Sequence, residues 1–216
     1  MVSSAPLSCR PAAHSPSGAG PPEPSVGVLG LQGAVAEHLR ALQAAGAQVR
    51  AVRRPQELAG LDGLVIPGGE STAMARLAAP AHLFEAVREA YESGMAVFGT
   101  CAGLILMAET VVDAAALDGF PRIGGLDVVV RRNGYGSQLD SFSTDLQVSG
   151  LEGSLPAVFI RAPLIEAVEG SVEVLASARG RAVVVRQDRM LAASFHPELT
   201  ADTRLHRLFV TMAAGG

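Results

Sequence analysis

Apolar and polar positions alternate in a regular way along the first half of the chain. The apolar run of residues 26–33 ends in glycine. The segment after it repeats apolar residues at helical spacing, at Val35, Leu39, Leu42 and Ala45. This pair of patterns predicts a strand that leads into a helix.

The same alternation continues to residue 110. Patterns typical of strands cover residues 48–54, 64–69 and 95–100, and patterns typical of helices cover 81–94 and 102–110, with a short helix before residue 62. Such alternation indicates an α/β fold, with a doubly wound, mostly parallel, flavodoxin-like sheet and helices on both faces. Sites in these sheets form at the carboxyl ends of the strands.

The second half of the chain has a different pattern. Short strand-like runs with turn residues between them fill residues 126–193. We expect them to be antiparallel or mixed strands that continue the same sheet, closed by a C-terminal helix from about Asp202 to Ala213.

Composition divides the 216 residues into two parts. Residues 1–25 are rich in Pro, Ser, Ala and Gly and contain no apolar segment of the kind found in a signal peptide, so they are predicted to form a flexible extension. The chain is 49% hydrophobic and 18% charged, which is typical of a globular protein. Residues 26–213 are therefore predicted to form one domain.

Charge and cysteine usage narrow the class of partner. The net charge is -4 and no run of Lys or Arg exceeds two residues, which argues against nucleic acid as a partner. No apolar stretch approaches the ~18 residues that would span a membrane. The two cysteines, Cys9 and Cys101, lie in unlike surroundings, so a disulfide is not expected and a reducing cytoplasmic location is favoured.

Cys101 lies where a strand pattern gives way to a helix pattern. Gly99 and Gly103 flank it two residues away on each side, which is the G-x-C-x-G form of a nucleophile elbow. Small neighbours allow the tight turn, and a helix N-terminus favours a thiolate. The alternative is an ordinary buried cysteine. Such a cysteine needs no glycine pair, so the elbow is favoured.

The segment Ser194–Thr200 supplies a partner for a catalytic thiol. A thiol with an ordinary pKa of about 8.5 is little ionised at neutral pH, so it needs a histidine base and a group that orients this base. His196 and Glu198 provide such a pair, and Pro197 favours extended backbone at His196. Alternatively, the segment is a surface loop with a capping glutamate.

The other histidines offer no such pairing. They lie in the extension or on predicted helix faces and are expected to be solvated; they are His14, His38, His82 and His206.

A third candidate segment is Val65–Thr72, a buried strand that ends in Gly68 and Gly69. Paired glycines let a ligand approach the backbone, Glu70 could accept from an ammonium group, and Ser71 could cap a helix. A sharp turn or a phosphate loop is the alternative. The segment lacks the lysine of a nucleotide-binding P-loop, which disfavours ATP.

Taken together, these segments resemble the class I (triad) glutamine amidotransferases, and within them the family of glutaminase subunits of pyridoxal 5'-phosphate synthase. The resemblance covers nearly all of residues 26–212, in the family's order. The stretches that carry it are VGVLGLQGAVAEH, VIPGGEST, FGTCAGLILMA, RRNGYGSQLDSF, VFIRAP and SFHPELTAD.

The resemblance implies hydrolysis of L-glutamine to glutamate and ammonia. Cys101 would attack the side-chain amide, His196 would transfer the proton, and Glu198 would orient His196. The oxyanion would be held by the backbone N–H of Ala102 and by one from the Gly68–Gly69 turn. The substrate-binding residues implied by family position are Gly69, Glu70, Ser71, Arg132, Ile160 and Arg161.

The resemblance also implies a partner, a barrel-shaped synthase subunit that combines the ammonia with ribose 5-phosphate and glyceraldehyde 3-phosphate. It implies low glutaminase activity without that partner. Pyridoxal phosphate is then the product of the complex, and neither a cofactor nor a metal is expected on this chain.

Two features depart from the family pattern. Gly134, Tyr135 and Ser137 stand in a segment where the family usually has a basic residue at the last of these positions. The proline-rich extension is also atypical.

Three alternative functions are weighed against this resemblance: the glutaminase of another amidotransferase such as the histidine-pathway enzyme, a cysteine-elbow stress sensor or chaperone, and a catalytically silent regulatory subunit. The motifs PGGEST and FIRAP disfavour the first, and the His-Pro-Glu segment and the intact triad disfavour the others.

Overall fold

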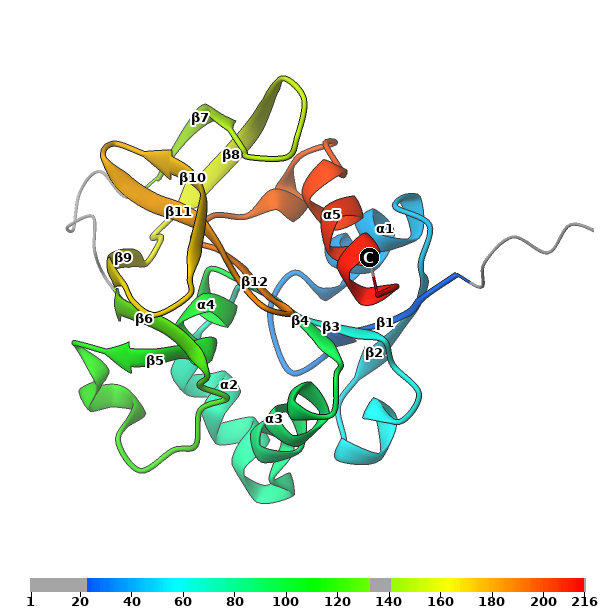
Figure 1. The fold of residues 1–216 in the computed structure, drawn as a ribbon. Helices are drawn as coiled ribbons and strands as arrows, with labels where there is room; N and C mark the ends of the chain where they lie inside the picture. The colour runs from blue at the N-terminus through cyan, green and yellow to red at the C-terminus, as the bar shows by residue number, and fades with distance from the viewer. Residues whose placement is uncertain (1–22, 133–140, 216) are drawn as a thin grey trace, which may run out of the picture.

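A seven-stranded sheet forms the centre of the molecule in the computed structural model, which describes residues 23–132 and 141–215 (Figure 1). The strand order is β10-β11-β12-β4-β3-β1-β2. The five strands from β12 to β2 run parallel to one another, whereas β10 and β11 add to the β12 edge in antiparallel pairs. This arrangement confirms the predicted α/β class with a mostly parallel sheet.

The strands are β1 (Ser25–Leu29), β2 (Gln48–Val52), β3 (Gly63–Ile66), β4 (Ala96–Thr100), β5 (Ala108–Val111), β6 (Leu126–Arg131), β7 (Ser141–Gln147), β8 (Ser154–Ile160), β9 (Leu164–Val168), β10 (Glu173–Ala178), β11 (Arg181–Gln187) and β12 (Met190–Ala193). The α-helices are α1 (Val35–Ala44), α2 (Ser71–Ala78), α3 (Leu83–Glu92), α4 (Ala102–Met107) and α5 (Arg204–Ala213). The 3₁₀ turns are η1 (Pro55–Leu58), η2 (Ala79–Ala81), η3 (Ala114–Leu117) and η4 (Pro197–Leu199).

Each face of the sheet carries its own hydrophobic core. Successive side chains of a strand point to opposite faces, so in β3 Leu64 and Ile66 join one core and Val65 joins the other. Helices α2, α3 and α4 pack on the first face, and α1 and α5 on the second, as Figure 1 shows. Because both faces are covered, the central strands are apolar throughout rather than alternating.

Two details of the predicted topology were wrong. Only β10, β11 and β12 continue the main sheet. The remaining late strands form a three-stranded sheet, β5-β6-β9, and a two-stranded sheet, β7-β8. Each small sheet buries one apolar face on a core, Val128 and Val130 on one side and Leu155 and Phe159 on the other. Burial of these faces, rather than extension of an edge, decides where the strands lie.

The helix expected over residues 102–110 is also shorter than predicted. α4 ends at Met107, and Ala108–Val111 is strand β5, which pairs in parallel with β6. The apolar run LILMA cannot by itself distinguish a buried helix from a buried strand, and the pairing with β6 resolves that ambiguity. The C-terminal helix α5 agrees with its predicted range.

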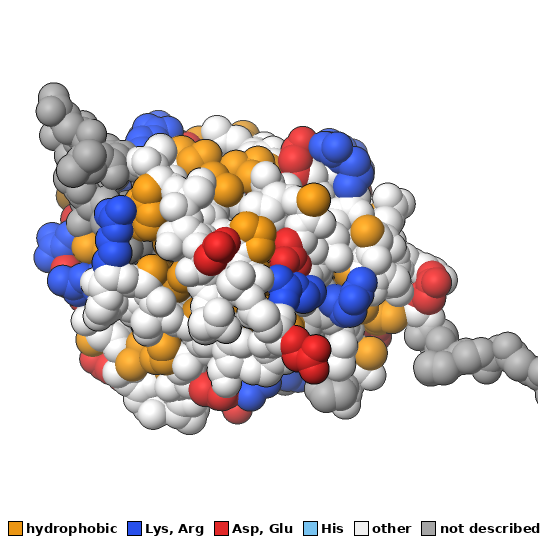
Figure 2. All heavy atoms as spheres, turned by 90° about the horizontal axis from the view of Figure 1, so that it is seen from above, with side chains coloured by type: hydrophobic (Ala, Val, Ile, Leu, Met, Phe, Trp, Pro, Cys, Tyr) orange, Lys and Arg blue, Asp and Glu red, His pale blue; other side chains and the backbone are white. Residues whose placement is uncertain are grey.

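Acidic and basic side chains are interspersed on the face drawn in Figure 2. Within residues 23–132 and 141–215, no helix is long and apolar enough to cross a membrane. In the same part of the chain, no group of three or more His, Cys, Asp or Glu side chains is arranged to hold a metal ion.

Candidate active site

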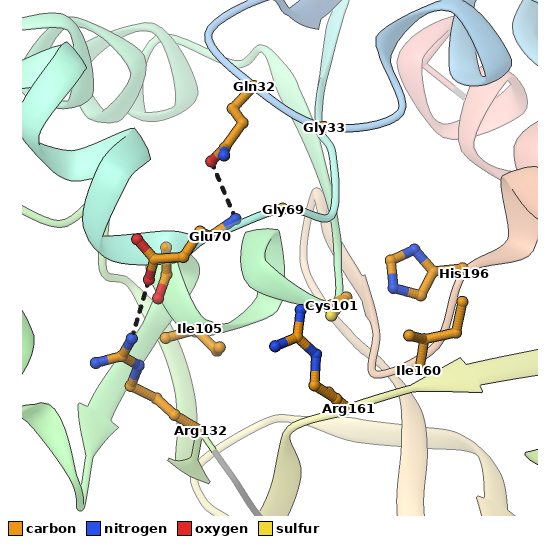
Figure 3. A pocket seen from close by; sticks show the side chains of 11 residues that line it. Gln32, Gly33, Gly69, Glu70, Cys101, Ile105, Arg132, Ile160, Arg161 and His196 are labelled. Carbon is orange, nitrogen blue, oxygen red and sulfur yellow. Dashed lines mark hydrogen bonds and ion pairs between the residues drawn. The ribbon is translucent and has the colours of Figure 1, made fainter. Parts of the chain in front are cut away.

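The carboxyl ends of β1, β3, β4 and β12 lead into loops that meet around one pocket of about 470 Å³ (Figure 3). This is the edge of a parallel sheet at which sites are expected. The lining residues come from six segments far apart in the sequence: Gln32, Gly33, Gly69, Glu70, Ser71, Cys101, Ile105, Arg132, Ile160, Arg161 and His196.

Cys101 stands between β4 and α4 with φ 48° and ψ -102°, a backbone conformation that costs a non-glycine residue of order 1–3 kcal/mol. The flanking glycines make the bend possible. A Cβ at Gly103 would lie 2.1 Å from the carbonyl oxygen of Ile66, and one at Gly99 would lie 2.7 Å from the Gly103 carbonyl carbon. The strand, the bend and the helix are therefore packed backbone against backbone, as the elbow hypothesis requires.

His196 and Glu198 follow directly after β12. The His196 backbone N–H donates to the Val158 carbonyl at 2.9 Å, which ties the segment to β8. The His196 Nδ1 lies 2.8 Å from Oε1 of Glu198, whose side chain is completely buried, whereas the His196 side chain keeps 13% of its surface exposed toward the pocket. The histidine thus has one nitrogen held by a carboxylate, and its ring lies at the pocket beside Cys101, as Figure 3 shows.

The surroundings of His196 favour its charged form. Burial opposes the charge, but hydrogen bonds to the Cys101 thiol and to Glu198, together with their negative charges, raise the pKa of His196 to about 10. Cys101 and His196 are therefore hydrogen-bonding neighbours. A cysteine nucleophile and its histidine base need such a pairing, and both roles stay predictions.

Gly68 brings the β3 loop against this pair. A Cβ at that position would lie 2.4 Å from Cε1 of His196 and 3.4 Å from Cβ of Cys101, so only glycine fits. Gly69 lines the pocket, and Ala102 is the first residue of α4, directly after Cys101. Backbone N–H groups of both segments are thus available near the sulfur, although the oxyanion role of these three residues stays a prediction.

Glu70, and not Ser71 as expected, is the N-cap of α2. Its carboxylate accepts from the backbone N–H groups of Thr72 at 3.0 Å and Ala73 at 2.7 Å. The same carboxylate pairs with Arg132 at 3.2 Å. A carboxylate caps better here because it satisfies two free N–H groups at once and faces the positive end of the helix.

The predicted substrate-binding residues all line the pocket: Gly69, Glu70, Ser71, Arg132, Ile160 and Arg161. Arg132 comes from the end of β6, and Ile160 and Arg161 from the end of β8, with Arg161 in a left-handed conformation at φ 43°. Figure 3 shows the Arg161 guanidinium next to Cys101 and the Arg132 guanidinium joined to Glu70. Their contacts with substrate stay a prediction.

Three pocket residues were missed. Gln32 and Gly33 follow β1, and the Gln32 side-chain oxygen accepts the Glu70 backbone N–H at 3.1 Å. The rule that sites form at the carboxyl ends of parallel strands could have found both. Ile105 lies four residues after Cys101, one helical turn away on the same face of α4.

The expectation that His38 and His206 are solvated was wrong, because both side chains are completely buried. A signal was available. His38 lies three residues after Val35 and four before Leu42, so it belongs to the apolar stripe of α1. His82 is exposed as expected. His14, Gly134, Tyr135 and Ser137 lie outside the described residues.

The chain is similar to known proteins over most of its length. A chain from Parafrankia sp. named pyridoxal 5'-phosphate synthase subunit PdxT is 57% identical over 188 residues, covering 87% of this chain and 92% of that one. A protein of the same name from Streptomyces griseus is 53% identical over 190 residues, covering 88% and 95%.

Solved structures show the same fold. One described as the crystal structure of glutamine amidotransferase has a TM-score of 0.81 at 47% identity and covers 87% of this chain and 98% of its own. A putative GMP synthase subunit from Thermoplasma acidophilum has a TM-score of 0.62 at 18% identity, covers 89% and 93%, and shows the fold alone. The model of the SNO glutamine amidotransferase family matches residues 28–214. With an elbow cysteine beside a glutamate-held histidine in the matched region, this chain belongs to the SNO glutamine amidotransferase family.

Proposed function

We propose that this chain is the glutaminase subunit of a cytoplasmic pyridoxal 5'-phosphate synthase. It hydrolyses L-glutamine to L-glutamate and ammonia and passes the ammonia to a synthase subunit. The observation that carries the proposal is the convergence of Cys101, on a strained elbow, with His196, whose other nitrogen is held by the buried Glu198. The names of the two relatives support the synthase as the partner.

The reaction runs through a thioester. The Cys101 thiolate attacks the side-chain amide carbon, and the tetrahedral intermediate collapses as His196 gives its proton to the departing ammonia. His196, now neutral, removes a proton from water, and the resulting hydroxide attacks the thioester. Glutamate leaves, and the thiolate and imidazolium are restored. Glu198 keeps the histidine in the tautomer and orientation that both steps need.

The oxyanion of each tetrahedral intermediate needs donors placed in advance. The backbone N–H of Ala102 and one from the Gly68–Gly69 turn are assigned this role. The close approach of Gly68 to both His196 and Cys101 supports it.

Substrate recognition rests on matched charges. The free amino acid is a zwitterion, with a carboxylate and an ammonium group on one carbon. The guanidinium groups of Arg161 and Arg132 suit the carboxylate, and Glu70, held by Arg132, suits the ammonium group. Gly69, Ser71 and Ile160 shape the remaining wall of the pocket.

Released ammonia is useful only if it reaches a second active site. We therefore assign the chain a heteromeric complex in which the synthase subunit makes pyridoxal phosphate from ribose 5-phosphate and glyceraldehyde 3-phosphate. Pyridoxal phosphate is the product of that complex, so no resident cofactor, nucleic acid or membrane enters the mechanism on this chain.

A glutaminase assay with and without the synthase subunit from the same organism tests the proposal. We expect glutamate release that rises when the synthase is added and that disappears in Cys101→Ala and His196→Asn. Synthesis of pyridoxal phosphate by the variant complexes should return when an ammonium salt replaces glutamine. Glutamine hydrolysis by the Cys101→Ala complex would show that the nucleophile is assigned wrongly.

A further inference from the structure

A second layer of polar side chains lies behind the His196–Glu198 pair. The Glu198 carboxylate is completely buried, and only its Oε1 is bonded, to His196. Within the described residues, Oε2 makes no hydrogen bond. Nε2 of His38 lies 3.4 Å from it. A buried anionic oxygen without a hydrogen bond is costly, so a donor placed beside it matters.

Both ring nitrogens of His38 lie within hydrogen-bond distance of another side chain. Its Nε2 lies 3.2 Å from the Thr100 hydroxyl, on the residue before Cys101, and its Nδ1 lies 3.0 Å from Nε2 of His206. His38 comes from α1 and His206 from α5, the two helices on the same face of the sheet. The side chains of His38, His206 and Thr100 are completely buried.

The geometry selects one tautomer for each of these histidines. If His38 carries its proton on Nε2, the N–H group can donate to the Thr100 hydroxyl and lies beside the Glu198 oxygen, and Nδ1 accepts from the Nε2–H of His206. Nδ1 of His206, which has no partner among the described residues, is then an unprotonated acceptor. The reverse arrangement buries an unpaired N–H on His206 and turns a lone pair of His38 toward the carboxylate. Both changes are costly.

We propose that His38 is a positioning residue for the Cys101–His196–Glu198 triad, donating its Nε2–H toward Glu198 so that the carboxylate presents Oε1 to His196, with His206 setting the tautomer of His38. The proposal rests on the proposed glutaminase function only for its kinetic test. The series of oriented side chains that begins at the Cys101 sulfur would then reach the interface between α1 and α5.

A neutral His38 suits this role better than a charged one. Burial, followed by the neighbouring His206 and His196, holds the pKa of His38 well below its ordinary value. A second imidazolium beside Glu198 would compete with His196 for the same negative charge. A neutral donor steadies the carboxylate without that competition.

Two substitutions separate positioning from packing. His38→Gln places an amide N–H near the position of Nε2, whereas His38→Met fills similar space and has no donor. In the complex with the synthase, we expect His38→Met to lower the kcat for glutamine hydrolysis by about tenfold to a hundredfold, with KM within about twofold. This is the scale found when outer-shell partners of functional histidines are lost. His38→Gln should recover most of the rate, and the exposed-site control His82→Asn should match the native protein.

A second readout needs neither glutamine nor the synthase. The rate of Cys101 alkylation by iodoacetamide, followed against pH, reports how well His196 and Glu198 support the thiolate. We expect the profile of His38→Met to be displaced from that of the native protein and the profile of His38→Gln to overlay it. If His38→Met and His38→Gln lose thermal stability equally and both keep the native alkylation profile and kcat, then His38 only packs, and the proposal is wrong.

The tautomers can be read in the native protein, which covers the case in which His38→Met does not fold. Two-dimensional ¹⁵N spectra of histidine-labelled protein distinguish protonated from unprotonated ring nitrogens, and His38→Gln and His206→Gln assign the signals. We expect both buried histidines to carry hydrogen on Nε2 alone. A proton on Nδ1 of His38 would overturn the proposal.

Discussion

At the scale of single residues, the site depends on positions where no other side chain fits. Cys101 has a positive φ at the tight bend between β4 and α4, and this bend places its side chain at the pocket. The G-x-C-x-G spacing predicted this bend. What the spacing could not reveal is the surface against which Gly103 packs, the carbonyl of Ile66 from another strand.

Gly103→Ala tests that contact. The added Cβ would meet the Ile66 backbone, which cannot rotate away, so we expect a loss of about 1–3 kcal/mol in the free energy of unfolding and a fall in glutamine hydrolysis as Cys101 is displaced. Urea unfolding and the glutaminase assay measure the two effects. Gly46→Ala is the control for the contact, since a Cβ at Gly46 would meet no atom within 4 Å, although Gly46, unlike Gly103, has a positive φ. It should cost about 1 kcal/mol and leave activity unchanged.

The charge on His196 predicts a dependence of stability on alkaline pH. The pKa of His196 rises from 6.5 in the unfolded chain to about 10 in the folded one, so the folded protein holds the proton more tightly. The resulting stabilisation is fully present below pH 6.5 and is lost as the pH rises through about 10. Relative to His196→Asn, the native protein should lose up to about 1.4 kcal/mol per pH unit in that window. A constant difference between the two unfolding curves from about pH 6 to about pH 10 would contradict this.

At the scale of elements, the hydrophobic pattern located most strands and helices of the first half and the last helix. It gave no helix for the residues of α2, and it was wrong where the pairing of strands decides the structure. The strand β5 and the two small sheets exist because their apolar faces find cover on the cores, which the local sequence does not encode. The start of α2 shows the same limit. Ser71 is the better cap by residue type, yet the backbone path gives the capping position to Glu70.

Glu70→Ala should therefore destabilise α2. Loss of the carboxylate frees two backbone N–H groups and the partner of Arg132, and we expect a decrease of about 1 kcal/mol in the free energy of unfolding, measured with urea. KM for glutamine should also rise, because the assigned ammonium site is lost. Glu85→Ala, in the first turn of α3, removes a carboxylate that does not cap its helix and should change stability little. Equal effects of the two substitutions would show that the Glu70 cap is unimportant.

At the scale of the whole molecule, α1 and α5 bring together two histidines 168 positions apart. Burial lowers the pKa of His206 to about 4 and holds the pKa of His38 low as well. Both histidines are thus neutral in the folded protein and must gain protons when the chain unfolds in acid. The stability of the packing between α1 and α5 therefore depends on pH through His38 and His206, and no local sequence pattern identifies these two residues as a pair.

We predict that acid weakens the native protein through these groups. The pKa of His206 is 6.5 in the unfolded chain and about 4 in the folded protein, so between these pH values the unfolded chain binds a proton that the folded protein does not. The contribution of neutral His206 to the free energy of unfolding is therefore fully present above pH 6.5 and is lost as the pH falls toward about 4. The slope is at most about 1.4 kcal/mol per pH unit for one histidine. His206→Gln keeps a donor for His38 and does not titrate. Its urea midpoint should fall less between about pH 6.5 and about pH 4 than that of the native protein, and an equal fall would contradict the argument.

The sequence by itself determined the α/β class, the elbow at Cys101, the pairing of His196 with Glu198 and most of the segments that meet at the pocket, though not the one with Gln32 and Gly33. These follow from residue type, short-range spacing and the family's motifs. The tertiary structure alone decided which strands share a sheet, which residue caps α2, and that His38 and His206 stand buried behind the triad. The physical reason is that burial and hydrogen bonding at these places depend on groups from distant segments, and the fold alone determines how far apart those groups lie.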